Sequence, residues 1–236
     1  MFAPTKSAPG KSAPAKSTTS PSLTSDMVLV HKVFRRELRL LAVLVGQVEQ
    51  GDRARAAVLA AHCRELTTAL QHHHAAETDL LWRRLAERAP LAPAVEHQLR
   101  GWHRQHAELM GELDGLLALW EQSPDADLQS VLTDILSELS AAVAEHLDAV
   151  EEFVLPAVDQ VFSSKEWLAC GLRAASWIPL NRMAWMLGAM LEDATAEEHQ
   201  NLMAKVPAPA RLLYRMVGQD QYVREMQVVR GAAFAA

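Results

Sequence analysis

Four histidines interrupt apolar stripes of helical spacing, one in each of four segments: His31, His73, His106 and His146. A buried imidazole without a partner costs roughly 1–3 kcal/mol, so four in one core are better explained as metal ligands than as packing residues. Glu77 follows His73 by four positions, about 40° around a helix, so both side chains can reach one metal. Imidazole and carboxylate donors without thiolate suit iron best, with manganese and zinc behind.

Two further histidines are candidates for the same site. His74 adjoins His73 and can serve as an extra ligand or as a hydrogen-bond partner at its edge. His103 lies one turn before His106, and two histidines at this spacing can share a metal. We expect the other histidines on the surface or in packing contacts, and Arg35 and Glu37 on a solvated face of the first helix; these histidines are His62, His72, His97 and His199.

Four helices must position these residues, because apolar residues recur at alternating steps of three and four. The first is predicted from Ser25 or Asp26 to Gly51, the second over Arg53–Arg88, and the third over Pro93–Trp120. The fourth follows Pro124, and its inward stripe runs through His146 to Phe153. Short connections favour antiparallel neighbours. The sequence therefore predicts an all-α, up-down antiparallel four-helix bundle over residues 26–162.

The ends of the chain differ from this region. Residues 1–25 are rich in Pro, Ser, Thr and Lys and carry no acidic residue, so we expect a disordered tail. Residues 163–236 are expected to form a helical C-terminal extension packed on the bundle as a cap. The alternative is a cover over an open end of the bundle that shapes a substrate or gas pocket.

Composition disfavours several classes of protein. A formal charge of −6 without a basic run gives little support to nucleic-acid binding. The most apolar stretch, Leu168–Leu191, is interrupted by charged residues and a proline, so no membrane association is expected. Cys63 and Cys170 stand far apart without a CxxC motif, which argues against a disulfide scaffold, a zinc ribbon or an iron–sulfur cluster. A reducing, cytoplasmic location suits such a chain.

The most specific motif is the run His-His-His-Ala-Ala-Glu-Thr-Asp-Leu-Leu-Trp at residues 72–82. With His106, His146-Leu147-Asp148 and residues 154–156, it resembles the hemerythrin-like (cation-binding HHE) family. The run, and the segment 167–222, are similar to the actinobacterial branch, which carries a C-terminal helical extension. The resemblance implies a non-haem di-iron centre inside a four-helix bundle, and O₂, peroxide or nitric oxide as the small ligand.

One position departs from the family pattern. Val150 stands four residues after His146, where relatives usually carry a bridging Glu. Glu151 is the candidate ligand instead, because its spacing from His146 fits that of oxygen-carrying hemerythrins. On an ideal helix it points about 140° away from His146, so it can ligate only through a π-bulge or local unwinding. Without it, the second metal is weakly held or absent.

Two functions are compatible with these residues. The first is a non-haem di-iron oxidoreductase that reacts with O₂, peroxide or nitric oxide. The second is a non-enzymatic carrier or a sensor of iron or oxygen. No site for an organic substrate, flavin or nicotinamide is evident, and the oligomeric state stays open. The expected metal ligands are His31, His73, Glu77, His106, His146 and Glu151, with His74 and His103 as possible additions.

Overall fold

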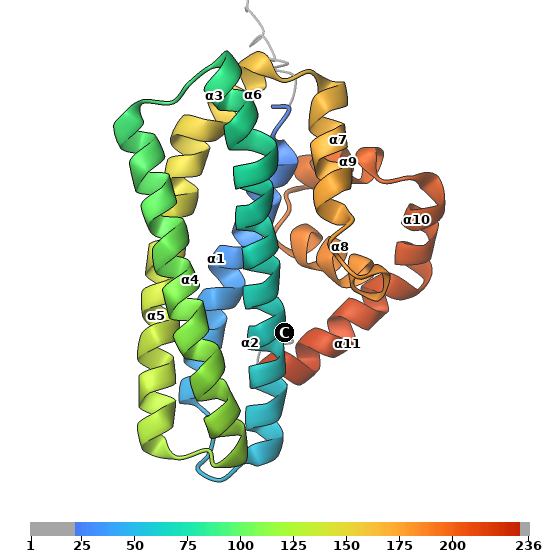
Figure 1. Cartoon of the computed structure of the whole chain (residues 1–236). Coiled ribbons are helices and arrows are strands. Elements are labelled where there is room, and N and C mark those ends of the chain that lie inside the picture. Colours follow the sequence, from blue (N-terminus) through green and yellow to red (C-terminus); the bar gives the residue numbers. More distant parts are fainter. Residues whose placement is uncertain (1–21, 232–236) are drawn as a thin grey trace, which may run out of the picture.

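The computed structural model of the chain describes residues 22–231, and every regular element in this range is helical. The long helices are α1 (Ser25–Gly46), α2 (Arg53–Ala76), α4 (Pro93–Gln122) and α5 (Ala126–Ala149). They lie side by side, with α1 against α2 and α5, and α4 against α2 and α5 (Figure 1). The predicted all-α four-helix bundle is confirmed.

Two of the long helices continue through π-helical turns. After α2 come η1 (Glu77–Trp82) and α3 (Arg83–Arg88), and after α5 come η2 (Val150–Val154) and α6 (Leu155–Val161). A π turn inserts one extra residue into a helix and rotates the side chains beyond it, and such turns are frequent at functional sites. Both turns lie at the same end of the bundle.

Local signals explain where the helices begin and end. The side chains of Asp52 and Asp125 accept hydrogen bonds from backbone N–H groups in the first turns of α2 and α5, each at 2.9 Å. The first helix was predicted to reach Gly51, and this is wrong because α1 ends at Gly46. Gly51 has φ +84° in the following turn, and its N–H donates to the carbonyl of Pro124 at 2.9 Å.

The folded region begins before the predicted boundary at residue 25. Residues 1–21 of the expected tail lie outside the described residues. Ser22 Oγ, in contrast, donates to Asp159 at 2.6 Å, and the backbone N–H of Thr24 donates to the same carboxylate at 3.2 Å. Thr24 is buried. Residues 22–25 therefore belong to the bundle, because they cap the start of α1 against α6.

The interior consists of two hydrophobic clusters. The first, here called the lower cluster, includes Leu59, Trp120 and Leu139 and fills most of the bundle. The second, here called the upper cluster, includes Leu81 and Val154 and lies beside the two π turns. Both clusters are closely packed apolar regions that keep water out of the bundle.

The C-terminal extension lies along the α1 and α2 side of the bundle. It comprises α7 (Ser164–Ala175), η3 (Leu180–Arg182), α8 (Met183–Glu192), α9 (Ala196–Lys205), α10 (Ala208–Leu213), η4 (Tyr214–Gly218) and α11 (Gln219–Arg230). Helices α7 and α11 contact α2, and α8 and α9 contact α1 (Figure 1). The extension thus covers a side of the bundle rather than one of its ends.

A buried charge network joins the extension to the bundle. Glu37 is only 1% exposed, and its carboxylate lies 2.7 Å from Arg36 Nε, 2.6 Å from Arg230 Nη2 and 3.2 Å from His62 Nε2. The expectation that Glu37 is solvated is wrong because α8 and α11 cover this face. Arg35 lies at the surface but is engaged with Glu151.

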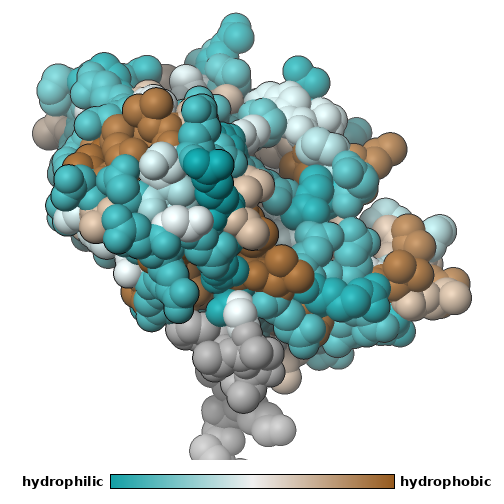
Figure 2. Space-filling model, turned by 90° about the horizontal axis from the view of Figure 1, so that it is seen from below, coloured by the Kyte–Doolittle hydropathy of each residue, from teal (hydrophilic) through white to brown (hydrophobic). Residues whose placement is uncertain are grey.

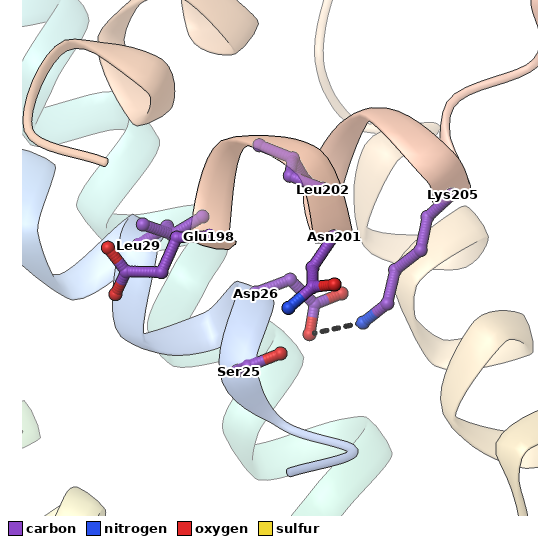
Figure 3. A pocket seen from close by; sticks show the side chains of 7 residues that line it. All are labelled: Ser25, Asp26, Leu29, Glu198, Asn201, Leu202 and Lys205. Atoms are coloured by element: carbon purple, nitrogen blue, oxygen red, sulfur yellow. Dashed lines mark ion pairs between the residues drawn. The ribbon is translucent and has the colours of Figure 1, made fainter. Parts of the chain in front are cut away.

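A second contact fixes the start of α1. Figure 3 shows a small pocket between this start and α9, where Lys205 Nζ lies 3.3 Å from Asp26. The indole N–H of Trp167 on α7 donates to the same carboxylate at 3.0 Å. Nearly two turns further along α1, Lys32 pairs with Glu198 at 2.8 Å. These bonds hold the part of α1 that carries His31.

The outer part of the extension exposes apolar side chains. Figure 2 shows hydrophobic atoms at its right-hand end, where α10 lies in Figure 1. The exposed large apolar residues of α10 and η4 are Leu212, Leu213, Met216 and Val217. Within residues 22–231, no helix is long and apolar enough to cross a membrane.

The new N-terminal boundary can be tested by two truncations. A chain that starts at Asp26 loses the bonds between residues 22–24 and Asp159, whereas a chain that starts at Ser22 keeps them. Each lost hydrogen bond costs about 1 kcal/mol. Two such bonds are lost, so we expect the shorter chain to melt roughly 4–8 °C below the longer one. Equal melting temperatures in calorimetry would show that residues 22–25 contribute nothing to the fold.

Candidate metal centre

The predicted site residues form a polar layer between the two hydrophobic clusters. On the second helix, Leu70 belongs to the lower cluster and Leu81 to the upper one. On α4, Leu99 belongs to the upper cluster and Met110 to the lower one. On the second helix, His73 and His74 stand between Leu70 and Leu81. On α4, His103 and His106 stand between Leu99 and Met110. Histidines His31, His73, His74, His106 and His146 are all buried.

The imidazoles and Glu77 form two groups that could each hold a metal ion. One group contains His31, His73 and Glu77, and the other contains His74, His103 and His146. Within each group the candidate ligand atoms all lie within 4.8 Å of one another. The adjacent residues His73 and His74 serve different groups because neighbouring side chains on a helix diverge by about 100°.

The Glu77 carboxylate lies between the two groups and is completely buried. Its Oε1 is 3.3 Å from His73 Nε2. Its Oε2 is 2.9 Å from His103 Nε2 and 3.4 Å from His146 Nε2. One carboxylate oxygen therefore faces each group, which is the arrangement that a carboxylate bridging two metals requires.

His106 lies beside the second group without belonging to it. Its Nδ1 is 3.4 Å from His74 Nε2, and the two rings are stacked with centroids 5.1 Å apart. His106 is fully buried. It is therefore close enough to support His74 or to approach the same metal.

The polar layer contains buried atoms without hydrogen-bond partners among the described residues. They are His31 Nε2, His73 Nε2, Glu77 Oε1, His106 Nε2, and both ring nitrogens of His146. Leaving a buried polar atom unsatisfied costs about 1–3 kcal/mol. Metal ions would satisfy one nitrogen of each ligating imidazole and the free oxygen of Glu77, so the donor set fits a metal centre of nitrogen and oxygen ligands.

A π turn lies at or shortly after the candidate ligands of α2 and of α5. Turn η1 begins at Glu77, and η2 begins at Val150, which is four residues after His146. Val150 is fully buried in the upper cluster. Phe153, predicted on the inward stripe, is 43% exposed because the π turn shifts the register and places Val154 inward instead. The sequence offered no signal for the turn in the second helix.

Glu151 lies elsewhere than the predicted ligand position. The π turn that this role required is present, but Glu151 lies outside both groups of candidate ligands. Its Oε1 lies 2.7 Å from His31 Nδ1 and 2.7 Å from Arg35 Nη1. The guanidinium of Arg35 and the imidazole of His31 draw the carboxylate towards α1. Glu151 thereby fixes the His31 ring, and Nε2 faces His73 and Glu77.

Burial controls the protonation of the site. Burial lowers the pKa of His146 to about 3 and that of His106 to about 4, and it lowers the pKa of His74 even further. Burial alone would raise the pKa of Glu77, but its contacts with His73, His146 and His103 hold it well below the ordinary value. At neutral pH these imidazoles are neutral and Glu77 is ionised, as metal ligands must be.

Aromatic side chains enclose the polar layer. Trp82 stacks on His103 with ring centroids 4.5 Å apart, and Phe34 lies 5.2 Å from the His73 ring. On the remaining side, Trp102 lies 5.9 Å from the His146 ring. These rings restrict the access of water and fix the orientations of the imidazoles.

Comparison with known proteins agrees with this geometry. A family model described as the hemerythrin HHE cation binding domain matches residues 22–158, more than half of the chain. The chain therefore belongs to the hemerythrin HHE cation-binding family, whose domain holds metal cations. The matched range contains every residue of both groups. Searches of curated proteins and of solved structures found no match.

A substitution can test whether Glu151 binds a metal itself or only orients the His31 ring. Glu151→Ala removes the acceptor for His31 Nδ1 but no member of either group, so we expect metal affinity to fall about 10–100-fold with the number of metals per saturated chain unchanged. Asp148→Asn is the matched control, because Asp148 is 74% exposed and its only ion pair among residues 22–231 is with Arg35. Loss of a whole metal at saturation, or no change in affinity, would contradict the assignment.

The pKa shifts also predict how the stability of the metal-free protein depends on pH. The ordinary pKa of 6.5 applies to His106 and His146 in the unfolded chain, and their values are lower in the folded chain. Their neutral forms therefore stabilise the fold fully above about pH 6.5, and this contribution is lost as the pH falls below it. Urea unfolding at about pH 5.5 should give a free energy lower by about 1 kcal/mol or more than at about pH 7.5. A free energy of unfolding that is equal at both pH values would contradict the shifts.

Proposed function

We propose that this chain is a non-haem di-iron protein that binds or reacts with O₂, peroxide or nitric oxide, as an oxidoreductase. The observation that carries the proposal is the position of Glu77, whose two oxygens face two separate groups of imidazoles. Iron is favoured over manganese and zinc because the donors are imidazole and carboxylate without thiolate.

The side chains have distinct tasks in this proposal. His31, His73 and one oxygen of Glu77 would hold one iron, and His74, His103, His146 and the other oxygen would hold the second. Bound iron would supply the electron transfer to the small oxidant. Burial lowers the pKa of His74 and His146, so these two imidazoles need not release protons at neutral pH before they bind metal. Arg35 and Glu151 would keep His31 in its orientation.

Charge balance favours an additional anionic ligand. The two groups contain a single carboxylate, Glu77, because Val150 occupies the corresponding place on the fourth helix. Two divalent cations together with this one carboxylate would carry a net charge of +3. In a region enclosed by apolar clusters, such an excess strengthens the binding of an anion. A reactive site that takes up an oxygen-derived anion fits this electrostatic environment.

The buried position of the centre favours a small ligand. The imidazoles of both groups are at least largely buried, and none of them lines the small pocket at the start of α1. The burial of the imidazoles also suits the second candidate, a carrier or sensor that binds a diatomic molecule reversibly. We place the protein in a reducing cytoplasm because both cysteines are buried and unpaired.

Metal content tests the proposal first. Expressed with sufficient iron, the full-length chain should contain about two iron atoms. Glu77→Ala should reduce iron at both groups together, whereas His31→Ala should reduce it mainly at one. Elemental analysis of the purified variants measures both effects. Iron well below one atom per chain, with no other transition metal bound, would refute the metal centre.

Turnover distinguishes the oxidoreductase from the carrier. An oxidoreductase should consume many equivalents of peroxide or O₂ per iron when a reductant is supplied, as measured with an oxygen electrode or a peroxide assay. A carrier should take up about one equivalent and release it under vacuum. Stoichiometric, reversible uptake without turnover would contradict the enzymatic proposal while leaving the metal centre intact.

A further inference from the structure

A second candidate binding site lies between the bundle and the extension, away from the imidazole groups. It is an open groove of about 440 Å³ between α2 on one side and η3, α8 and α11 on the other. This volume is within the range of sites for small organic molecules. The pocket at the start of α1, in contrast, has room for little more than a water molecule, at about 20 Å³.

The base of the groove is apolar. Trp185 of α8 and Met226 of α11 line it and are almost completely buried, and Val58 and Val228 line its walls. Val228 is 60% exposed although it is apolar. An apolar molecule in the groove would cover this surface and gain roughly 25 cal/mol for each Å² removed from water.

The two arginines of the groove differ in their environment. Arg182 is held by Glu65 and Glu225, at 2.8 Å from each, and its guanidinium lies 5.2 Å from the Trp185 ring centroid. Its single charge is therefore more than balanced by the two carboxylates. Arg224 also lines the groove but is exposed and forms no ion pair with any of residues 22–231. It offers a free positive charge at the edge of an apolar surface.

His62 adds a polar group with a defined orientation. Its Nε2 lies 3.2 Å from the carboxylate of Glu37. Burial would raise the pKa of Glu37, but His62, Arg36 and Arg230 hold it at about 2. The carboxylate is therefore ionised and accepts hydrogen bonds. This contact with Glu37 fixes the orientation of the His62 ring, which lines the groove.

We propose that this groove binds a small organic carboxylate with an apolar body. The carboxylate would pair with Arg224, and the apolar body would lie on Trp185 and Met226 between Val58 and Val228. The site is independent of metal occupancy, because none of these residues belongs to the two imidazole groups.

The competing explanation is that the charged residues serve only to dock the extension. That explanation accounts for Arg36, Arg230 and Arg182, which pair with carboxylates across the interface. It does not account for Arg224 or for the exposed apolar wall. These two features distinguish a ligand site from a docking interface, and they can be changed at exposed positions without disturbing the buried network.

Isothermal titration calorimetry on the full-length chain tests the proposal, with octanoate as the probe and octanamide as its uncharged counterpart. Octanoate should bind saturably at one site per chain, and octanamide should bind about tenfold more weakly because it lacks the charge. Arg224→Gln should weaken octanoate about tenfold and leave octanamide unchanged. Arg215→Gln, an equal change of charge at an exposed position of η4 outside the groove, should alter neither.

A blocking variant locates the bound probe. Val228→Trp places a large side chain in the groove at an exposed position and should abolish the binding of both probes. If octanoate fails to bind saturably, the proposal is wrong. It is equally wrong if Arg224→Gln behaves like Arg215→Gln, or if Val228→Trp binds octanoate normally, because the probe then occupies another surface such as the apolar residues of α10.

Discussion

The structure depends on one buried carboxylate. Glu77 is ionised in the middle of a four-helix bundle, where an isolated charge would be strongly unfavourable. His73, His103 and His146 surround it, and no Lys or Arg among the described residues forms an ion pair with it. Imidazoles alone stabilise an anion weakly when they are neutral. The arrangement is therefore one in which cations complete the balance of charge, and this requirement explains why each long helix contributes a histidine.

The rest of the bundle keeps this polar layer dry and fixed. Hydrophobic clusters lie on both sides of it, and aromatic rings such as Trp82 and Phe34 lie against the imidazoles. The π turns after Glu77 and at Val150 change the side-chain register where the layer meets the upper cluster. The extension contributes from outside, because α7 and α9 hold the start of the helix that carries His31. Its other helices leave a groove that is chemically distinct from the centre.

The fold could be predicted because apolar spacing, caps and prolines act locally, and the histidines stood out because they interrupt that spacing. What failed depended on contacts between distant segments. Glu37 was predicted to be solvated, but α11 covers it. The direction of the Glu151 side chain depends on its contact with Arg35. Phe153 was misplaced because a π turn shifts the register by one residue, and no residue type specifies such a turn. The division of His73 and His74 between two groups likewise requires the positions of the neighbouring helices.

The central claim is that one carboxylate, Glu77, joins two metal sites. Anomalous X-ray scattering at the iron edge, from crystals of the iron-loaded full-length chain, tests it most directly. We predict two peaks about 3–4 Å apart, one beside His31 and His73 and one beside His103 and His146, with the Glu77 carboxylate between them. A single peak, or two peaks that do not flank Glu77, would contradict it.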